Sequence, residues 1–102
     1  GTTHVFRLRS YEMYPRLGPD DLMLCTLLPS LDTVMPSRRK VYVIQTGNRI
    51  LTRYITQINN QQNSIEVVAE DPVLGPVEVL ELAQIDYIWA ARYLLMQDEL
   101  VS

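Results

Sequence analysis

The feature that most constrains the fold of this chain is a pair of β-branched and aromatic runs joined by a two-residue turn. The runs cover residues 40–46 and 49–58, and Gly47 and Asn48 separate them. Gly and Asn tolerate the positive φ angles that a two-residue hairpin turn requires. The sequence therefore predicts a tight β-hairpin near the middle of the chain.

Other strand-forming segments lie on both sides of this hairpin. The polar cluster at 59–63 predicts a turn, and Pro and Gly punctuate the chain again at 71–76. Residues 80–91 could be read as a helix, but Ile, Tyr and Trp near a turn favour a strand. Besides the hairpin, the pattern predicts strands at 3–9, 22–28, 64–70, 77–82 and 85–95. We therefore expect an all-β (mainly β) protein.

Length and composition predict one folded domain. The 102 residues are 47% hydrophobic and 21% charged, which is ordinary for one globular domain with its own core. We assign residues 1–95 to this domain and residues 96–102 to a C-terminal tail. No apolar run is long enough to cross a membrane, so we expect a cytoplasmic protein without a membrane partner. Cys25 has apolar neighbours and is expected in the core.

The charged and reactive residues argue against several classes of function. A net charge of −3 disfavours a nucleic-acid-binding surface, and the basic run at 38–40 is typical of a solvated strand end. His4 is the only histidine, so Ser-His-Asp and Cys-His sites have no support. The acidic residues lack metal-ligand spacing and the glycines are isolated from one another. We therefore expect no metal and no cofactor.

An ordered series of short motifs is more specific than the composition. Met13 and Pro15 are followed by Asp21 at the start of an apolar strand. Then come a V-Y-V-I strand, a tight turn, L-T-R-Y-I at 51–55, A-E-D-P at 69–72 and I-W-A at 88–90. This order resembles the self-cleaving C-terminal domains of LexA, UmuD and lambda-type phage repressors, which are related in fold to signal peptidases. The resemblance implies small antiparallel sheets with a central β-hairpin.

The resemblance also implies where a catalytic site would lie. The family cleaves a peptide bond with a serine nucleophile and a neutral lysine that takes its proton. The matching positions hold Glu12 and Arg53, or Thr52 under a one-residue shift. A carboxylate attacks amides poorly and a guanidinium keeps its proton, so an inactive peptidase homologue is implied. We hypothesise a Glu12–Arg53 salt bridge; the alternative is that both side chains point into solvent.

Two other functions stay open. Ser10 lies two residues before Glu12 and could serve as the nucleophile of a LexA-type serine peptidase, although the sequence offers it no evident base. Alternatively, the cleft that holds the catalytic residues in the resembled family could bind a small ligand here, or a peptide that adds as a β-strand.

The resemblance favours an oligomerisation and regulatory domain of a bacterial or phage-derived transcriptional regulator. A helix-turn-helix domain is expected to precede it, and DNA would be bound only through that domain. A homodimer or higher homo-oligomer would form by edge pairing of the last strand. The candidate interface residues are Tyr87, Trp89, Arg92, Tyr93 and Leu95. The alternative is that Ile88 and Trp89 fill the core.

Overall fold

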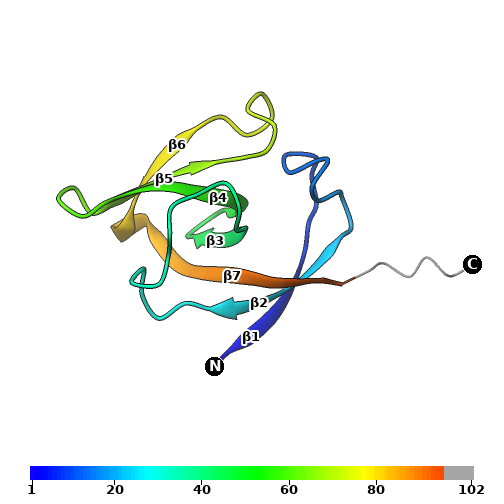
Figure 1. The fold of residues 1–102 in the computed structure, drawn as a ribbon, viewed down its shortest axis with the longest axis horizontal. Coiled ribbons are helices and arrows are strands. Elements are labelled where there is room, and N and C mark those ends of the chain that lie inside the picture. Colours follow the sequence, from blue (N-terminus) through cyan, green and yellow to red (C-terminus); the bar gives the residue numbers. More distant parts are fainter. Residues whose placement is uncertain (96–102) are drawn as a thin grey trace, which may run out of the picture.

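The computed structural model describes residues 1–95, and the predicted tail at 96–102 lies outside the described residues. In chain order the elements are β1 (Thr3–Arg7), β2 (Leu22–Leu27), β3 (Tyr42–Thr46), β4 (Ile50–Asn59), β5 (Ser64–Val68), β6 (Glu78–Glu81), a 3-10 turn η1 (Leu82–Gln84) and β7 (Ile85–Leu95). No α-helix occurs in the described part of the chain. The all-β prediction is confirmed, and the ambiguous segment at 80–91 is mostly strand (Figure 1).

All seven strands belong to one antiparallel sheet with the order β1-β2-β7-β3-β4-β5-β6. Strands β3 to β6 form a meander, in which each strand pairs with the next one in sequence. Strand β7 then returns to lie between β2 and β3, pairing with β2 along residues 89–95 and with β3 along residues 85–90. The expectation of several small sheets is therefore wrong, because the 11 residues of β7 are long enough to join two halves into one sheet.

The predicted central hairpin is present, but its turn works differently from the prediction. The N–H of Thr46 donates to the carbonyl of Arg49 at 2.9 Å and closes the β3–β4 turn. Neither Gly47 nor Asn48 has a positive φ, so the conformational freedom that motivated the prediction is not used there. The left-handed conformation occurs instead at Asn63, with φ of 50° in the turn between β4 and β5.

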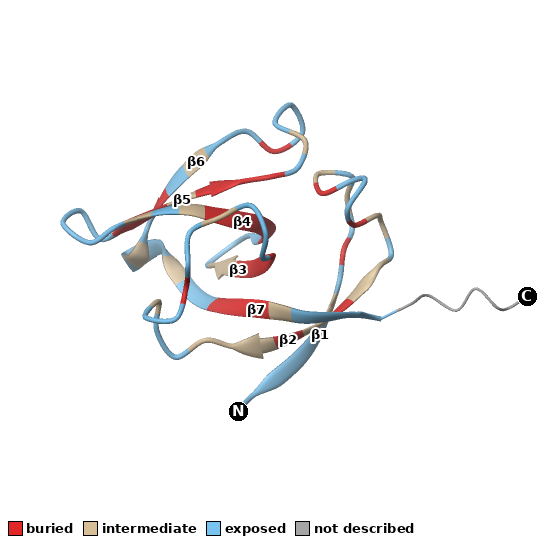
Figure 2. Cartoon of the chain, in the orientation of Figure 1, coloured by how far each residue is buried: buried red, intermediate tan, exposed pale blue. Residues whose placement is uncertain are grey.

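Two hydrophobic clusters cover the two faces of the sheet. Successive residues of β3 alternate between them, with Val43 in the first cluster and Ile44 in the second, because neighbouring side chains of a strand point to opposite faces. Residues 8–21, which connect β1 to β2, cover the first cluster with Leu8, Met13 and Leu17. The buried residues concentrate in β3, β4, β5 and the middle of β7 (Figure 2).

The core includes Cys25, as the sequence predicts. Its side chain is fully buried in the first cluster, and burial raises the pKa of the thiol to about 11. A neutral buried thiol behaves as a small apolar side chain. The same cluster contains Trp89, and Ile88 lies in the second cluster. The core alternative for these two residues of β7 is therefore correct.

Candidate functional site

The structure brings Glu12 and Arg53 together. Arg53 lies on β4 with 3% of its side chain exposed, and its Nη1 is 2.5 Å from a carboxylate oxygen of Glu12. Glu12 belongs to the connection between β1 and β2 and is 26% exposed. This is the contact that the salt-bridge hypothesis expects, and the alternative with both side chains in solvent does not hold. An ion pair of this kind offsets much of the cost of burying the guanidinium.

Backbone contacts fix the position of Glu12. The ends of its connection are tied by two hydrogen bonds, from the N–H of Leu8 to the carbonyl of Asp21 at 2.9 Å and from the N–H of Asp20 to the carbonyl of Leu8 at 2.8 Å. Asp20 has a φ of 73°, a left-handed conformation that aspartate tolerates better than most residues. The N–H of Asp71 also donates to the carbonyl of Glu12 at 2.9 Å. Two separate loops therefore hold this residue against β4.

The loop that follows β5 packs directly on the guanidinium of Arg53. Asp71 organises this loop, since its carboxylate accepts from the N–H of Val73 at 2.8 Å and of Leu74 at 3.2 Å. A Cβ atom placed on Gly75 would lie 2.6 Å from the Cβ of Ala69 and 3.1 Å from an Arg53 nitrogen. Only glycine allows this approach without a shift of the surroundings. The backbone of the loop therefore closes one side of the ion pair.

The chemistry available at this pair is limited. Arg53 also donates to the carbonyl of Thr52 at 2.9 Å, while its Nε has no partner in the described structure. Ser10 donates its hydroxyl proton to the second carboxylate oxygen of Glu12 at 3.1 Å. A guanidinium cannot accept the hydroxyl proton. The site therefore provides neither an activated hydroxyl nor a neutral amine.

The remaining residues that could act as a base lie elsewhere. His4 packs against Phe6 and Trp89, with ring centroids 4.6 and 5.7 Å away. Lys40, the single lysine of the chain, lines a groove beside β7. The structure therefore gives Ser10 no contact with a histidine or a lysine, and the peptidase alternative gains no geometric support.

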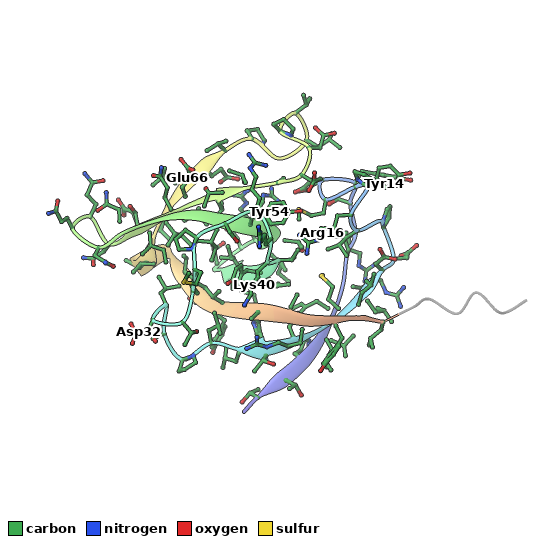
Figure 3. All side chains as sticks on the ribbon, viewed as in Figure 1. Tyr14, Arg16, Asp32, Lys40, Tyr54 and Glu66 are labelled. Atoms are coloured by element: carbon green, nitrogen blue, oxygen red, sulfur yellow. The ribbon has the colours of Figure 1, made fainter. Side chains whose placement is uncertain are left out.

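A second polar cluster, which the sequence did not reveal, lies next to this site around Tyr54. The Tyr54 hydroxyl donates to Glu70 at 2.5 Å, and Arg16 donates to the same hydroxyl at 3.3 Å. Burial and the hydrogen bond to Glu70 raise the pKa of Tyr54. Arg16 also donates to the carbonyl of Arg39 at 2.6 Å, so it ties the segment before β3 to β4 (Figure 3). Sequence separations of 16 and 38 residues explain why no local pattern indicated these contacts.

The five candidate interface residues do not form one surface. Tyr87 lies 6.5 Å from Trp89 between ring centroids, and Trp89 is only 8% exposed. Arg92 and Tyr93 instead line the groove beside β7, with Tyr42. A register shift in the pairing of β2 with β7 occurs between these two groups, opposite Leu24 and Cys25, and re-aims the side chains that follow it.

The prediction that β7 is an edge strand, free to pair with a second copy along its whole length, is wrong. Its position between β2 and β3 fills both of its sides over residues 89–90, and the strands at the two ends of the sheet are β1 and β6. The prediction failed because the sequence shows that a segment is a strand but not where it inserts in the sheet.

The fold and the site together define an all-β domain with a loop-covered, buried arginine–glutamate pair. Comparison of the chain with protein-family models, with curated proteins and with solved structures finds no match. Within residues 1–95, no helix has the length and apolarity needed to span a membrane. The same residues contain no cluster of three or more His, Cys, Asp or Glu side chains suited to hold a metal ion.

Proposed function

We propose that this chain is the oligomerisation and regulatory domain of a bacterial or phage-derived transcriptional regulator, and that it is a LexA-type domain without peptidase activity. The observation that carries the proposal is the contact between Glu12 and Arg53. These are the two positions at which the motif order places the serine and lysine of the resembled family. Residues distant in sequence meet where that resemblance requires them to meet.

The replacement of both residues accounts for the loss of activity. Peptide hydrolysis by this family needs a hydroxyl that loses its proton to a neutral amine. A guanidinium cannot act as the neutral amine, and Arg53 is instead paired with Glu12. The pair fixes the position of the β1–β2 connection on β4. In this proposal the domain works through association, and DNA is contacted only by a preceding helix-turn-helix domain.

Strand β1 is the part of the sheet that best fits association with a second copy. Its pairing with β2 includes a hydrogen bond from the N–H of Leu27 to the carbonyl of Thr2 at 2.9 Å. Because antiparallel ladders alternate, the backbone groups of Thr3, Val5 and Arg7 then point away from β2. An edge strand with unpaired N–H and C=O groups is a template for pairing with another chain. Symmetric pairing of two β1 strands would also bring two preceding DNA-binding domains together.

An aromatic surface next to this edge adds apolar contact area. We define it by His4 and Phe6 on β1 and Tyr87 on β7, whose rings pack around the buried Trp89. Tyr87 is 52% exposed there. Exposed aromatic side chains beside an open strand edge are typical of homodimer interfaces.

The test is the solution mass of the chain over a concentration series, measured by sedimentation equilibrium. We expect a dimer with a micromolar or lower Kd and a monomer for Val5→Pro, which removes an outward N–H without breaking the β1–β2 ladder. Val79→Pro is the matched control, because Val79 lies on the other edge strand, β6. The bond from the N–H of Leu82 to the carbonyl of Asn63 indicates that the N–H of Val79 also points outward.

Two results would contradict this proposal. A wild-type chain that stays monomeric at every accessible concentration would remove the oligomerisation function. A Val5→Pro variant that dimerises as well as Val79→Pro would move the interface away from β1. Mass spectrometry after incubation at alkaline pH tests the loss of peptidase activity separately, because a discrete cut in a longer chain would show that Ser10 is an active nucleophile.

A further inference from the structure

A groove of about 610 Å³ lies beside the last part of β7. We call it the β7 groove and define it by Arg16, Arg39, Lys40, Tyr42, Arg92 and Tyr93. It opens where β7 separates from the segment that leads into β3. The last backbone bond between them runs from the N–H of Ala91 to the carbonyl of Val41 at 3.0 Å. Beyond this point, the described residues 93–95 of β7 pair with β2 alone.

The β7 groove lies in the plane of the sheet rather than on one of its faces. Met23 lines it and belongs to the first hydrophobic cluster, whereas Tyr42 and Ala90 line it and belong to the second. A depression on one face of a sheet would contact one cluster only. The groove therefore has the position of a missing strand. Within residues 93–95, Leu94 presents its backbone N–H and carbonyl to it, because Tyr93 and Leu95 use theirs to pair with β2.

The charge of the groove is one-sided. Four of the nine Lys and Arg residues line it, Arg16, Arg39, Lys40 and Arg92, and no Asp or Glu does. Within residues 1–95 the ion pairs are made by Arg7, Arg49 and Arg53, so these four cations are left without a carboxylate partner there. In a chain with net charge −3, this concentration is local. The sequence-based view of the run at 38–40 as a mere solvated strand end is incomplete.

Neighbouring groups hold two of the four cations, Arg16 and Arg92, in place along the groove. Arg16 is fixed by the Tyr54 hydroxyl at 3.3 Å and by the carbonyl of Arg39 at 2.6 Å. Arg92 donates from Nε to the Thr26 hydroxyl at 3.4 Å. Side chains that are already positioned lose less conformational entropy when a ligand binds.

We propose that the β7 groove binds an extended acidic peptide segment of another protein, which adds as a strand to the free edge of β7. The backbone of the peptide pairs with the outward N–H and carbonyl of Leu94, and its carboxylates face the four cations. A peptide matches this site better than a nucleic acid, because a strand edge offers alternating donors and acceptors whereas phosphates use donors only. A second copy of β7 fits poorly, since it would bring another Arg92 into a basic site. The proposal does not depend on the oligomerisation function.

The test is fluorescence polarisation with a labelled peptide of alternating Val and Glu, added to the whole chain. We expect saturable binding that weakens as salt is raised and is absent for the matched Val-Gln and Val-Lys peptides. The double variant Arg39→Gln/Lys40→Gln should bind about tenfold more weakly, as expected for two partly screened charge contacts. Arg9→Gln/Arg38→Gln is the control, because it removes the same charge at exposed positions outside the groove lining.

Three kinds of outcome would each contradict a different step of the peptide proposal. Equal binding of the Val-Gln peptide, or equal losses in the two double variants, would show that the groove charge does not select the ligand. Undiminished binding of a Val-Glu peptide with N-methylated alternate amides would exclude strand addition. If single-stranded oligothymidine binds the groove more tightly than the peptide, the site is one for nucleic acid and the peptide proposal is overturned.

Discussion

At the scale of single residues, the balance between burial and pairing decides what Arg53 contributes. The guanidinium is 3% exposed and has one carboxylate partner, Glu12. Removal of one member of such a pair leaves the other charge buried without compensation, whereas removal of both members can be nearly neutral. The ion pair therefore specifies how the β1–β2 connection sits on β4 more than it adds net stability.

This argument predicts a non-additive pair of substitutions. Glu12→Ala should lower the free energy of unfolding by about 3 kcal/mol, because Arg53 then stays buried and unpaired. The double variant Glu12→Ala/Arg53→Met should recover most of that loss. Urea denaturation of the variants measures both effects, and Ser10→Ala is the control, with a loss of about 1 kcal/mol for one hydrogen bond. Equal losses for Glu12→Ala and the double variant would show that the pair is not coupled.

At the scale of the elements, local patterns were sufficient to predict strands but not their neighbours. The hairpin at 40–58 was predictable because both strands and their turn are contiguous in sequence. The place of β7 was not, because its partners β2 and β3 begin 63 and 43 residues earlier. The burial of Trp89 follows from that place, since its indole N–H also donates to Gln45 on β3 at 2.7 Å.

The candidate site was likewise predictable from the sequence only in part. Glu12 and Arg53 were predictable because a whole series of motifs fixed their order, and the structure brings them together. The packing of Gly75 on Arg53, the Arg16–Tyr54 contact and the β7 groove depend on long-range contacts that no short window of sequence contains. The hairpin turn was predicted at the right residues, but from an expected positive φ that Gly47 does not have.

The loop from β5 to β6 yields a prediction that compares two glycines. Gly75→Ala should cost about 1–3 kcal/mol, because the new Cβ would lie 2.6 Å from the Cβ of Ala69 and crowd Arg53. Gly47→Ala is the matched control: nothing lies within 4 Å of its added Cβ, and its φ is not positive. It should be neutral or slightly stabilising. Thermal or urea unfolding measures the difference, and equal effects would show that the loop moves away from Arg53 without cost.

At the scale of the whole molecule, the two edge strands of the open sheet differ in how well they resist pairing with another chain. Strand β6 carries charged residues at its edge, with Glu78 paired to Arg49 at 2.9 Å and Glu81 exposed. Charged side chains on an edge strand discourage pairing with another chain. Strand β1 carries one charged residue at its end, Arg7, and presents exposed Thr3 and Val5 beside the aromatic surface, so it is less protected along its length. This asymmetry is why the proposed dimer uses one end of the sheet only.

The asymmetry predicts where amide hydrogen exchange slows when the chain associates. At concentrations above the dimer Kd, the outward amides of Thr3, Val5 and Arg7 should become protected, because pairing of two β1 strands satisfies them. The outward amide of Val79 on β6 should keep exchanging at its monomer rate. Exchange followed by NMR at two protein concentrations measures both. Protection that arises at the outward amide of Leu94 instead would mean that a second copy occupies the β7 groove, and it would contradict the β1 interface and the acidic-peptide assignment together.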